Sequence, residues 1–245
     1  DRAYDNFFKK RGGYPKFKSK RYKQSYRTMN INANISIDGD SITLPKAGRV
    51  KIVNTRDFDG RIISATVSRT PSGRYYISLQ VEEECETLPN DGGSIGLDAG
   101  LKSLYTTSDS DIYPNPKTLS LHEKRMKRLQ RSLSRKKKGS KNSEKARLRL
   151  AREHEKVSDI RNDIQHKITH KLANENQVVC VEDLDVKGMM KDHRLAKYIS
   201  DASWSEPCRK PEYKIADHGG ILIKVPRTYA SSQICSCCGR KETKL

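Results

Sequence analysis

The chain has 245 residues, only 34% of them hydrophobic, and its 49 lysines and arginines exceed its 30 acidic residues to give a net charge of +19. An excess of this size indicates a polyanionic partner, of which nucleic acid is the commonest. A membrane surface is less favoured, because no basic stretch has an aromatic-rich apolar face and no run of about 18 apolar residues predicts a membrane span. The six irregularly spaced cysteines argue against a disulfide framework and favour a reducing, cytoplasmic setting.

The positive charge is concentrated in two segments. Residues 1–27 contain ten basic and two acidic residues, residues 117–175 contain 19 basic and seven acidic ones, and the rest of the chain is nearly neutral. The length allows one large domain or two small ones. The basic surface is therefore expected on these two segments and not over the whole molecule.

Residues 1–13 are expected to form the end of a helix that stops at Gly12 and Gly13. In residues 14–22 aromatic side chains alternate with cations, which suits RNA or single strands because bases stack on aromatic rings while cations bind phosphates. The alternative is an ordinary basic loop whose aromatic residues pack into a core. The predicted nucleic-acid-binding residues of this segment are Tyr14, Lys16, Phe17, Lys18 and Lys20.

Residues 29–84 show a hydrophobic period of two, which predicts short antiparallel strands. Turn signals at residues 38–39 and 70–73 separate them. Strands at this spacing favour a small, OB-like antiparallel β-barrel over residues 29–84, and residues 88–93 are expected to be a linker. The predicted strands cover residues 31–37, 42–44, 50–53, 62–68 and 75–81.

The second half of the chain combines strand and helix signals, so the predicted fold class is α+β. Short apolar runs predict strands, and apolar stripes over residues 119–172 predict an antiparallel helix pair. The connection at 135–141 is a cationic tip; the alternative is a solvated helix surface, but lysine triplets without acidic partners repel one another unless a polyanion lies nearby. The strands are expected at 94–98, 104–107, 177–182 and 221–225, and the tip residues predicted to bind nucleic acid are Arg135, Lys136, Lys137, Lys138 and Lys141.

Asp98 and Glu182 close two of the predicted strands. Each alone is a weak signal, since an acid at a strand end is commonly a turn former or a cap, which is the role expected of Asp183 and Asp185. Together they predict carboxylates on neighbouring strands at one sheet edge, where they can share the two Mg²⁺ ions of a phosphodiester-cleaving site. The order of strands, acids and basic hairpin is similar to that of the ribonuclease-H-like sheet in RuvC-type nucleases.

Cys235 and Cys238 have the spacing of a zinc knuckle and predict half of a tetrahedral Zn²⁺ site. A redox Cys-x-x-Cys motif is the alternative, but no thioredoxin-like βαβ pattern precedes it. Cys237 is a further thiol inside the knuckle and leaves the choice of ligands open. His166 and His170 lie four residues apart on a predicted helix without an adjacent glutamate, so surface histidines are expected there and not a metal site.

Seven motifs occur in the same order as in one known family, at residues 13–18, 96–100, 133–142, 181–184, 199–204, 213–214 and 231–239. On these residues the chain resembles the TnpB family, transposon-encoded RNA-guided DNA endonucleases that are also described as OrfB probable transposases and are relatives of type V CRISPR effectors. The resemblance implies guide RNA and target DNA as partners, Mg²⁺ at the catalytic acids, a structural Zn²⁺, and a location in the prokaryotic cytosol at the nucleoid. Asp98 and Glu182 match the first two catalytic acids of the family.

The resemblance also implies a domain organisation. Residues 1–13 correspond to the end of a recognition-domain helix, residues 14–88 to a wedge β-barrel, and residues 92–230 to a RuvC-like nuclease domain. Within that domain the basic helical hairpin covers residues 117–175. Residues 231–245 correspond to the first half of a zinc ribbon.

The chain departs from the family pattern at both ends and in one internal segment. The third catalytic aspartate, the second cysteine pair and the upstream recognition helices of the family are not found in these 245 residues. The chain is therefore expected to be either a fragment of a longer reading frame or a degenerate copy, and as given it is expected to bind nucleic acid without cutting DNA. Pro207 and Pro211 stand where the family has apolar helix residues. Because proline inside a helix removes a backbone hydrogen bond and costs about 3 kcal/mol, they are expected to shorten or break the helix after Trp204. The function expected of the complete reading frame is RNA-guided, Mg²⁺-dependent DNA cleavage, of which this chain would form the body; the alternative is a catalytically inactive RNA- or DNA-binding remnant.

Overall fold

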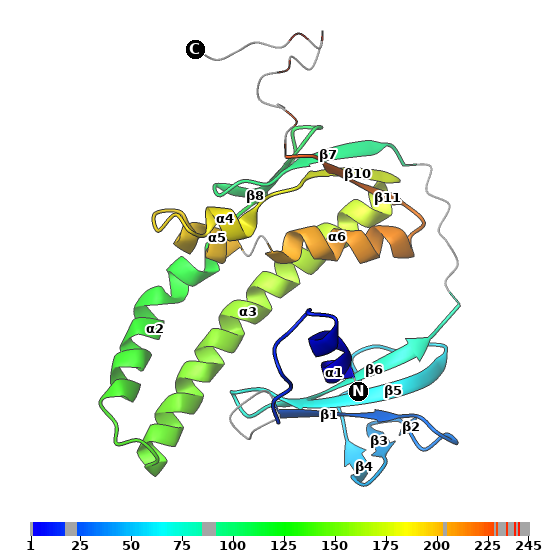
Figure 1. The fold of residues 1–245 in the computed structure, drawn as a ribbon, viewed down its shortest axis with the longest axis vertical. Helices are drawn as coiled ribbons and strands as arrows, with labels where there is room; N and C mark the ends of the chain where they lie inside the picture. The colour runs from blue at the N-terminus through cyan, green and yellow to red at the C-terminus, as the bar shows by residue number, and fades with distance from the viewer. Residues whose placement is uncertain are drawn as a thin grey trace. The chain divides into compact units, whose positions relative to one another are not determined.

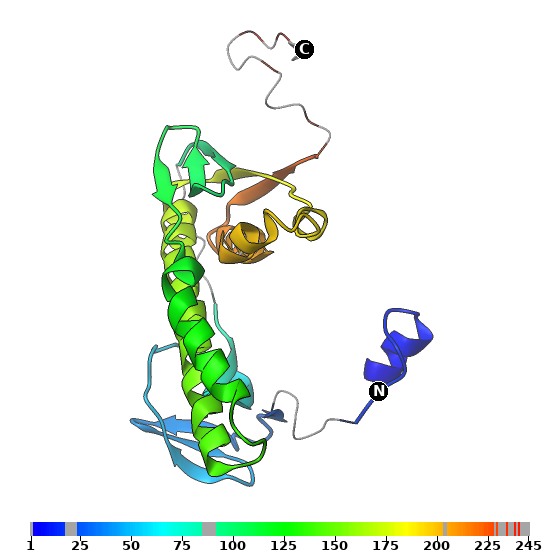
Figure 2. The same ribbon diagram turned by 90° about the vertical axis from the view of Figure 1, so that its left-hand side faces the viewer.

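The computed structural model describes residues 2–17, 24–84, 92–202 and 205–227, together with residues 229, 234, 238 and 240. The chain divides into two compact units, residues 1–84 and residues 85–245, each with its own hydrophobic core. The predicted linker at 88–93 lies largely outside the described residues. Figures 1 and 2 show the elements of each unit.

The first unit contains one short helix and two open antiparallel sheets (Figure 1). One sheet has the strand order β1-β5-β6 and the other has the order β2-β3-β4. The elements are α1 (Arg2–Phe8), β1 (Gln24–Met29), β2 (Ser36–Asp38), β3 (Ser41–Leu44), β4 (Gly48–Lys51), β5 (Arg61–Arg69) and β6 (Tyr75–Glu82).

The two sheets of the first unit share one small core. Ile42 and Leu44 of β3 are buried while Thr43 between them is exposed, as the period of two along a strand requires. They belong to one buried cluster with Ile35, which precedes β2, and with Ala65 of β5. The apolar alternation that predicts strands in the sequence therefore corresponds to the face that each strand turns to this core.

Parts of the prediction for this unit are wrong. The strand predicted at 31–37 is reduced to β2, because Asn32 and Ala33 have φ angles of 53° and 55° and form a turn. The sequence does not predict β1, since Gln-Ser-Tyr-Arg-Thr-Met has no apolar alternation. A closed barrel is not confirmed: in the described part of the unit the strands form two separate sheets.

The second unit is built on a mixed sheet of five strands with the order β11-β10-β7-β8-β9 (Figure 1). β7, β10 and β11 are parallel to one another, whereas β8 and β9 continue the sheet as antiparallel strands. All four strands predicted for this half of the chain are present, and only β9 was not predicted. Their bounds are β7 (Ser94–Asp98), β8 (Ser103–Thr107), β9 (Ile112–Pro114), β10 (Val178–Glu182) and β11 (Ile221–Val225).

Helices pack against one face of this sheet. Ile95 and Leu97 of β7 and Val179 and Val181 of β10 are buried in a cluster with side chains of three helices, α3, α5 and α6. The alternate residues of the same strands lie on the opposite face. The helices are α2 (Thr118–Ser134), α3 (Lys141–Glu175), α4 (Val186–Met189), α5 (Ala196–Ala202) and α6 (Ser205–Asp217).

The predicted helix pair is confirmed by α2 and α3, which lie side by side as a long hairpin (Figures 1 and 2). α4 and α5 were not predicted, because the stretch after β10 is polar, whereas α6 lies where the resemblance implied a helix interrupted by two prolines. None of the described helices combines the length and the hydropathy that crossing a bilayer requires.

Pro207 and Pro211 do not break the helix that contains them, because α6 is continuous from Ser205 to Asp217. Pro207 lies in the first turn, where backbone N–H groups have no acceptor within the helix. Pro211 removes one interior hydrogen bond, but its side chain is fully buried, and Ile215 one turn later is 1% exposed in the core. Burial of this face of α6 therefore offsets the free-energy cost of proline inside the helix. The prediction from the sequence considered that cost without the burial.

Candidate functional site

Asp98 and Glu182 end two strands that lie side by side in the sheet. β7 and β10 are parallel, and their register pairs Leu97 with Val181. Asp98 and Glu182 are the next residues on these strands, whose backbones are roughly 4.8 Å apart as neighbours in a sheet. The structure therefore brings together the two carboxylates that the sequence indicates.

Both residues line one shallow hollow of about 300 Å³ on the face of the sheet opposite the helices. Asp98 is exposed and Glu182 is half-buried. Thr106, which pairs with Asp98 across β7 and β8, and Ser108 add hydroxyl groups to the same hollow. The hollow is open to solvent, and these carboxylate and hydroxyl groups lie beside apolar lining residues such as Val181 and Val225.

The donor atoms at this edge suit a hard divalent cation. Mg²⁺ is usually held by one or two carboxylates and completes its shell with water and phosphate oxygens. Within the described residues no group of three or more His, Cys, Asp or Glu side chains could hold a metal, so a carboxylate pair is what the protein offers here. Cys180, two residues before Glu182 on the same face, is a soft donor that Mg²⁺ does not prefer.

Asp183 and Asp185, which follow Glu182, have structural partners. Arg227 Nε donates to Asp183 Oδ2 at 2.8 Å and to the carbonyl oxygen of Asp183 at 3.0 Å. That hydrogen bond raises the pKa of Arg227 above its ordinary value. Asp185 caps α4, because its Oδ1 accepts a hydrogen bond from the Gly188 N–H at 3.1 Å. The predicted capping role is confirmed for Asp185, whereas Asp183 pairs with an arginine.

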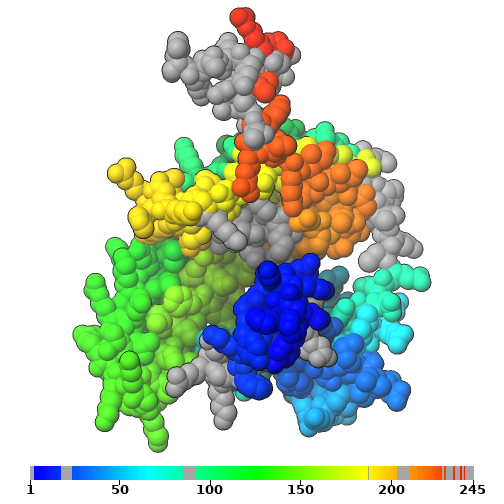
Figure 3. All heavy atoms as spheres, viewed as in Figure 1, coloured from blue at the N-terminus to red at the C-terminus, as the bar shows by residue number. Residues whose placement is uncertain are grey.

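The predicted cationic tip consists of the loop between α2 and α3 together with Lys141, the first residue of α3. The loop turns at Gly139, whose φ is +80°, and Ser140 caps α3 by accepting a hydrogen bond from the Ser143 N–H at 3.1 Å. The side chains of the hairpin stand out from the surface of the molecule, in green in Figure 3. The exposed cations that the structure gathers at this end are Arg135, Lys136, Lys137, Lys138 and Lys141.

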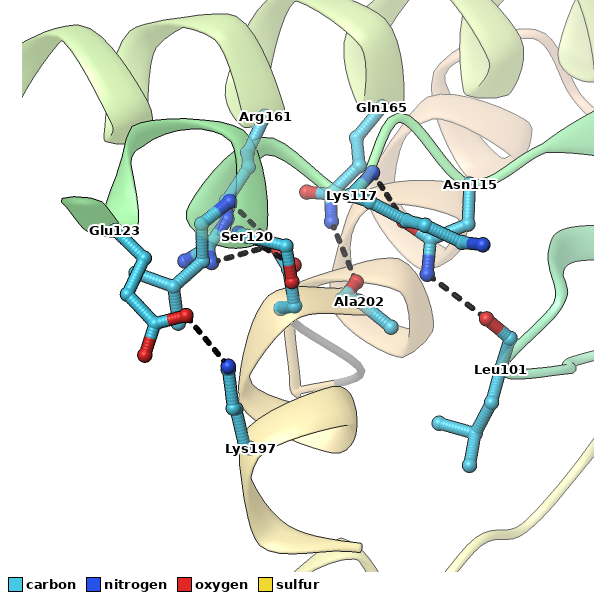
Figure 4. Close-up of polar contacts among 11 residues, drawn as sticks. Leu101, Asn115, Lys117, Ser120, Glu123, Arg161, Gln165, Lys197 and Ala202 are labelled. Atoms are coloured by element: carbon cyan, nitrogen blue, oxygen red, sulfur yellow. Dashed lines mark hydrogen bonds and ion pairs between the residues drawn. The ribbon is translucent and has the colours of Figure 1, made fainter.

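A buried carboxylate that no sequence pattern indicates lies at the other end of the hairpin. Asp201 of α5 is 4% exposed, and its oxygens accept hydrogen bonds from the backbone N–H groups of Leu119 at 2.7 Å and Ser120 at 3.2 Å. Arg161 Nη2 of α3 donates to the same carboxylate at 2.9 Å (Figure 4). Lys117 precedes α2 and makes no side-chain cap, so Asp201 caps α2 from far along the chain.

Two further contacts join these helices around Asp201. Lys197 of α5 pairs with Glu123 of α2 at 2.7 Å, and Gln165 of α3 donates to the carbonyl oxygen of Ala202 at 3.4 Å (Figure 4). Hydrogen bonds from Lys127 and Lys197 lower the pKa of Glu123 to about 2. The base of the hairpin is therefore fixed to α5 by buried and partly buried polar contacts.

A second buried acid joins the two helices of the hairpin. Glu153 of α3 is 4% exposed, and it pairs with His122 Nδ1 at 2.7 Å and with Arg125 Nε at 3.0 Å, both on α2. These contacts show which side of α2 faces α3. No spacing in the sequence indicates them, because the partners are 28 to 31 residues apart along the chain.

The aromatic and basic residues predicted near the N-terminus are exposed where they are described. Phe17 is 101% exposed and Tyr14 is 65% exposed, and Lys16 is exposed as well. The ring of Tyr14 packs edge-on against that of Phe7, with centroids 5.4 Å apart. Phe17 therefore does not pack into a core, as the alternative interpretation required; Lys18 and Lys20 lie outside the described residues.

Of the predicted zinc ligands, Cys238 is an exposed free thiol and Cys235 lies outside the described residues, as does Cys237. His166 and His170 are exposed on α3, which confirms the expectation of surface histidines. The zinc site therefore stays a prediction.

Comparison with known families and proteins gives several matches. A family model described as OrfB_IS605, probable transposase, matches residues 76–193, and a model described as Cas12f1-like, TNB domain, matches residues 204–245. Relatives named "Putative RNA-guided DNA endonuclease" occur in Streptomyces pristinaespiralis, 36% identical over 99% of this chain, and, as InsQ, in Escherichia coli K12, 34% identical over 100% of it. The chain spans 61% and 65% of the lengths of these relatives.

One solved structure with a similar fold is a chain in the cryo-EM structure of a Cas12f1-sgRNA-target DNA complex. It matches 75% of this chain and 39% of its own length, with a TM-score of 0.50 and 19% sequence identity. The similarity concerns the fold.

Proposed function

Because this chain belongs to the TnpB-like family of OrfB_IS605 transposases, we propose that it acts in RNA-guided, Mg²⁺-dependent cleavage of DNA. In this proposal the second unit is a RuvC-like nuclease domain over residues 92–230. Guide RNA and target DNA are the partners, which agrees with the names of the relatives. The location that follows is the prokaryotic cytosol at the nucleoid.

The observation that supports the nuclease assignment best is the register of β7 and β10, which puts Asp98 beside Glu182. The sheet order β9-β8-β7-β10-β11, with the helical hairpin between β9 and β10, supports a ribonuclease-H-like arrangement. In parallel strands the carboxyl ends meet at one edge, so neither acid needs a long loop to reach the other.

Asp98 and Glu182 would hold Mg²⁺, which when bound activates a water molecule and stabilises the leaving oxygen of a phosphodiester. The chain itself contributes the orientation of these acids. The ion pair between Arg227 and Asp183 joins the segment after β11 to the residue that follows Glu182. It thereby limits the motion of the backbone that carries the Glu182 carboxylate. The hydroxyl groups of Thr106 and Ser108 can donate hydrogen bonds to oxygens that enter the hollow.

We further propose that Cys235 and Cys238 form half of a structural Zn²⁺ site, in a zinc ribbon whose first half covers residues 231–245. The match of residues 204–245 to a Cas12f1-like TNB domain agrees with a distinct module here. Structural zinc needs four ligands in a tetrahedral arrangement. Two thiolates would therefore need two further donors.

We also propose that residues 14–88 form a wedge domain that binds guide RNA. Its exposed segment with Tyr14, Lys16 and Phe17 would contribute to this binding. The tip cations from Arg135 to Lys141 bind a phosphate backbone. Sequence would be read by base pairing between guide and target, with the protein recognising the backbone and shape of the duplex. The exposure of these side chains and the net charge of +19 support this division of roles.

The test is cleavage of a matching DNA target by the full-length protein with its guide RNA and Mg²⁺. Glu182→Gln and Asp98→Asn should each abolish cleavage while RNA binding is kept, because both substitutions preserve shape and remove one negative charge. Asp217→Asn, at an exposed carboxylate in the last turn of α6, is the matched control and should cut normally.

Two results would contradict the proposal. Normal cleavage by both Asp98→Asn and Glu182→Gln would remove these acids from the chemistry. Binding of guide and target without cleavage by the unsubstituted protein would favour the alternative function, an inactive nucleic-acid-binding protein.

A further inference from the structure

A straight row of cations lies along one side of α2 and ends at Arg135, the first cation of the tip already described. Lys124, Arg128, Arg131 and Arg135 follow one another at steps of four, three and four residues, and all four are exposed. On an α-helix such steps put side chains on one face. The row is about 16 Å long, because each helical residue adds about 1.5 Å.

The row faces away from the partner helix. His122, which contacts Glu153 of α3, is two residues before Lys124, a rotation of about 200° around the helix. Arg125 reaches the same carboxylate from the side of α2, about 60° around the helix from Arg128. Arg135 keeps helical backbone angles, with φ −80° and ψ −3°, so the row continues to the end of α2. The packing of the hairpin therefore leaves this side of α2 uncovered within the second unit.

The charge of the row is not compensated. Glu123 is the only acid between residues 118 and 141, and it is already paired with Lys127 at 2.8 Å and with Lys197 at 2.7 Å. Within the described residues none of the four cations of the row forms an ion pair. On α3, by contrast, exposed acids such as Glu144, Asp159 and Asp163 lie among the basic residues. Cations of one sign in a row repel one another unless an anionic partner lies along them.

We infer that this row on α2, formed by Lys124, Arg128, Arg131 and Arg135, binds one strand of a double-helical region of RNA along its phosphates. A double-stranded partner is favoured, because the row contains no aromatic side chain on which unpaired bases could stack. Neighbouring phosphates of one strand lie only a few ångström apart, so a row about 16 Å long can contact several of them. The choice of RNA rests on the proposed function, in which the guide is the lasting partner.

The test replaces all four residues of the row with alanine and measures the affinity for a structured RNA as a function of salt. Because each phosphate contact contributes roughly 0.7 to 0.9 to the slope of log K against log salt, the slope should flatten by about three units. Alanine at exposed helix positions keeps the fold, which circular dichroism verifies. A variant that keeps Lys124 and replaces the three arginines of the row with lysine should retain most of the slope, because it keeps all four positive charges.

The matched control removes four cations that already have acidic partners: Arg147, Lys167, Lys171 and Lys224. The control variant loses the same net charge, and its slope of log K against log salt should change by less than about one unit. Equal effects of the two quadruple variants would overturn the row as a site. An equal loss on a DNA duplex of the same sequence would overturn the choice of RNA.

The outcome is separable from that of the proposed function. Cleavage that needs Glu182, together with an unchanged salt slope in the row variant, would contradict only the row. Absence of RNA binding by the unsubstituted protein would contradict both.

Discussion

Replacing Asp201 with alanine should lower the free energy of unfolding of the second unit by about 3 to 5 kcal/mol, the range for breaking a buried ion pair by removing one partner. The carboxylate is 4% exposed and accepts three hydrogen bonds, from two backbone N–H groups of α2 and from Arg161. Loss of the helix cap alone costs about 1 kcal/mol. The larger part comes from Arg161, whose side chain is 17% exposed and would be left without this anion.

Urea denaturation followed by tryptophan fluorescence measures this effect, because the single tryptophan, Trp204, belongs to the second unit. Asp217→Ala, which removes an exposed carboxylate of α6, should change stability by no more than about 0.5 kcal/mol. Arg161→Met combined with Asp201→Ala should cost less than the sum of the two single changes, since neither charge then remains buried alone. A cost below about 1 kcal/mol for Asp201→Ala, or simple additivity in this cycle, would refute the argument.

Three other predictions concern the tip, one acid and one glycine. Replacing the lysines at 136–138 with alanine should flatten the salt slope of RNA binding by about two to three units, and an unchanged slope would remove the tip from the binding surface. Glu123 should titrate by NMR with a pKa of about 2, because Lys127 and Lys197 stabilise its charged form. Since its pKa is depressed on folding, its stabilising contribution is present above about pH 4.5 and is lost as the pH falls towards 2; a normal pKa in the folded protein would contradict the two contacts. Gly220→Ala should destabilise the second unit by about 1 to 3 kcal/mol, as overpacking does, because its Cβ would lie 2.8 Å from a backbone carbonyl oxygen and from an isoleucine side chain; an unchanged urea midpoint would show that the turn adapts.

The strands of the second unit could be predicted because their physics is local. β7, β10 and β11 are short apolar runs that end at turns or acids, and a buried strand needs little else to be recognised. Once Asp98 and Glu182 are placed at the ends of parallel strands, their proximity follows from the geometry of a sheet. The apolar stripes of the hairpin helices α2 and α3 can likewise be recognised from neighbouring residues in the sequence.

The parts that were not predicted depend on contacts between distant residues. Asp201 caps a helix that begins more than 80 residues earlier, and a lone aspartate in a polar stretch gives no sign of this role. α6 persists through Pro211 because one of its faces is buried, which a propensity argument does not include. The turn at Asn32 and Ala33 interrupts an apolar alternation that by itself favours a strand.

Whether Asp98 and Glu182 hold a divalent metal can be measured directly with Mn²⁺, which broadens the NMR signals of nearby amides and can be competed with Mg²⁺. Broadening in the 245-residue chain should centre on the carboxyl ends of β7 and β10. It should disappear in Asp98→Asn and in Glu182→Gln, and excess Mg²⁺ should reverse it. Broadening that persists in both variants, or that centres on other acids such as Asp159 and Asp163 of α3, would contradict the central claim.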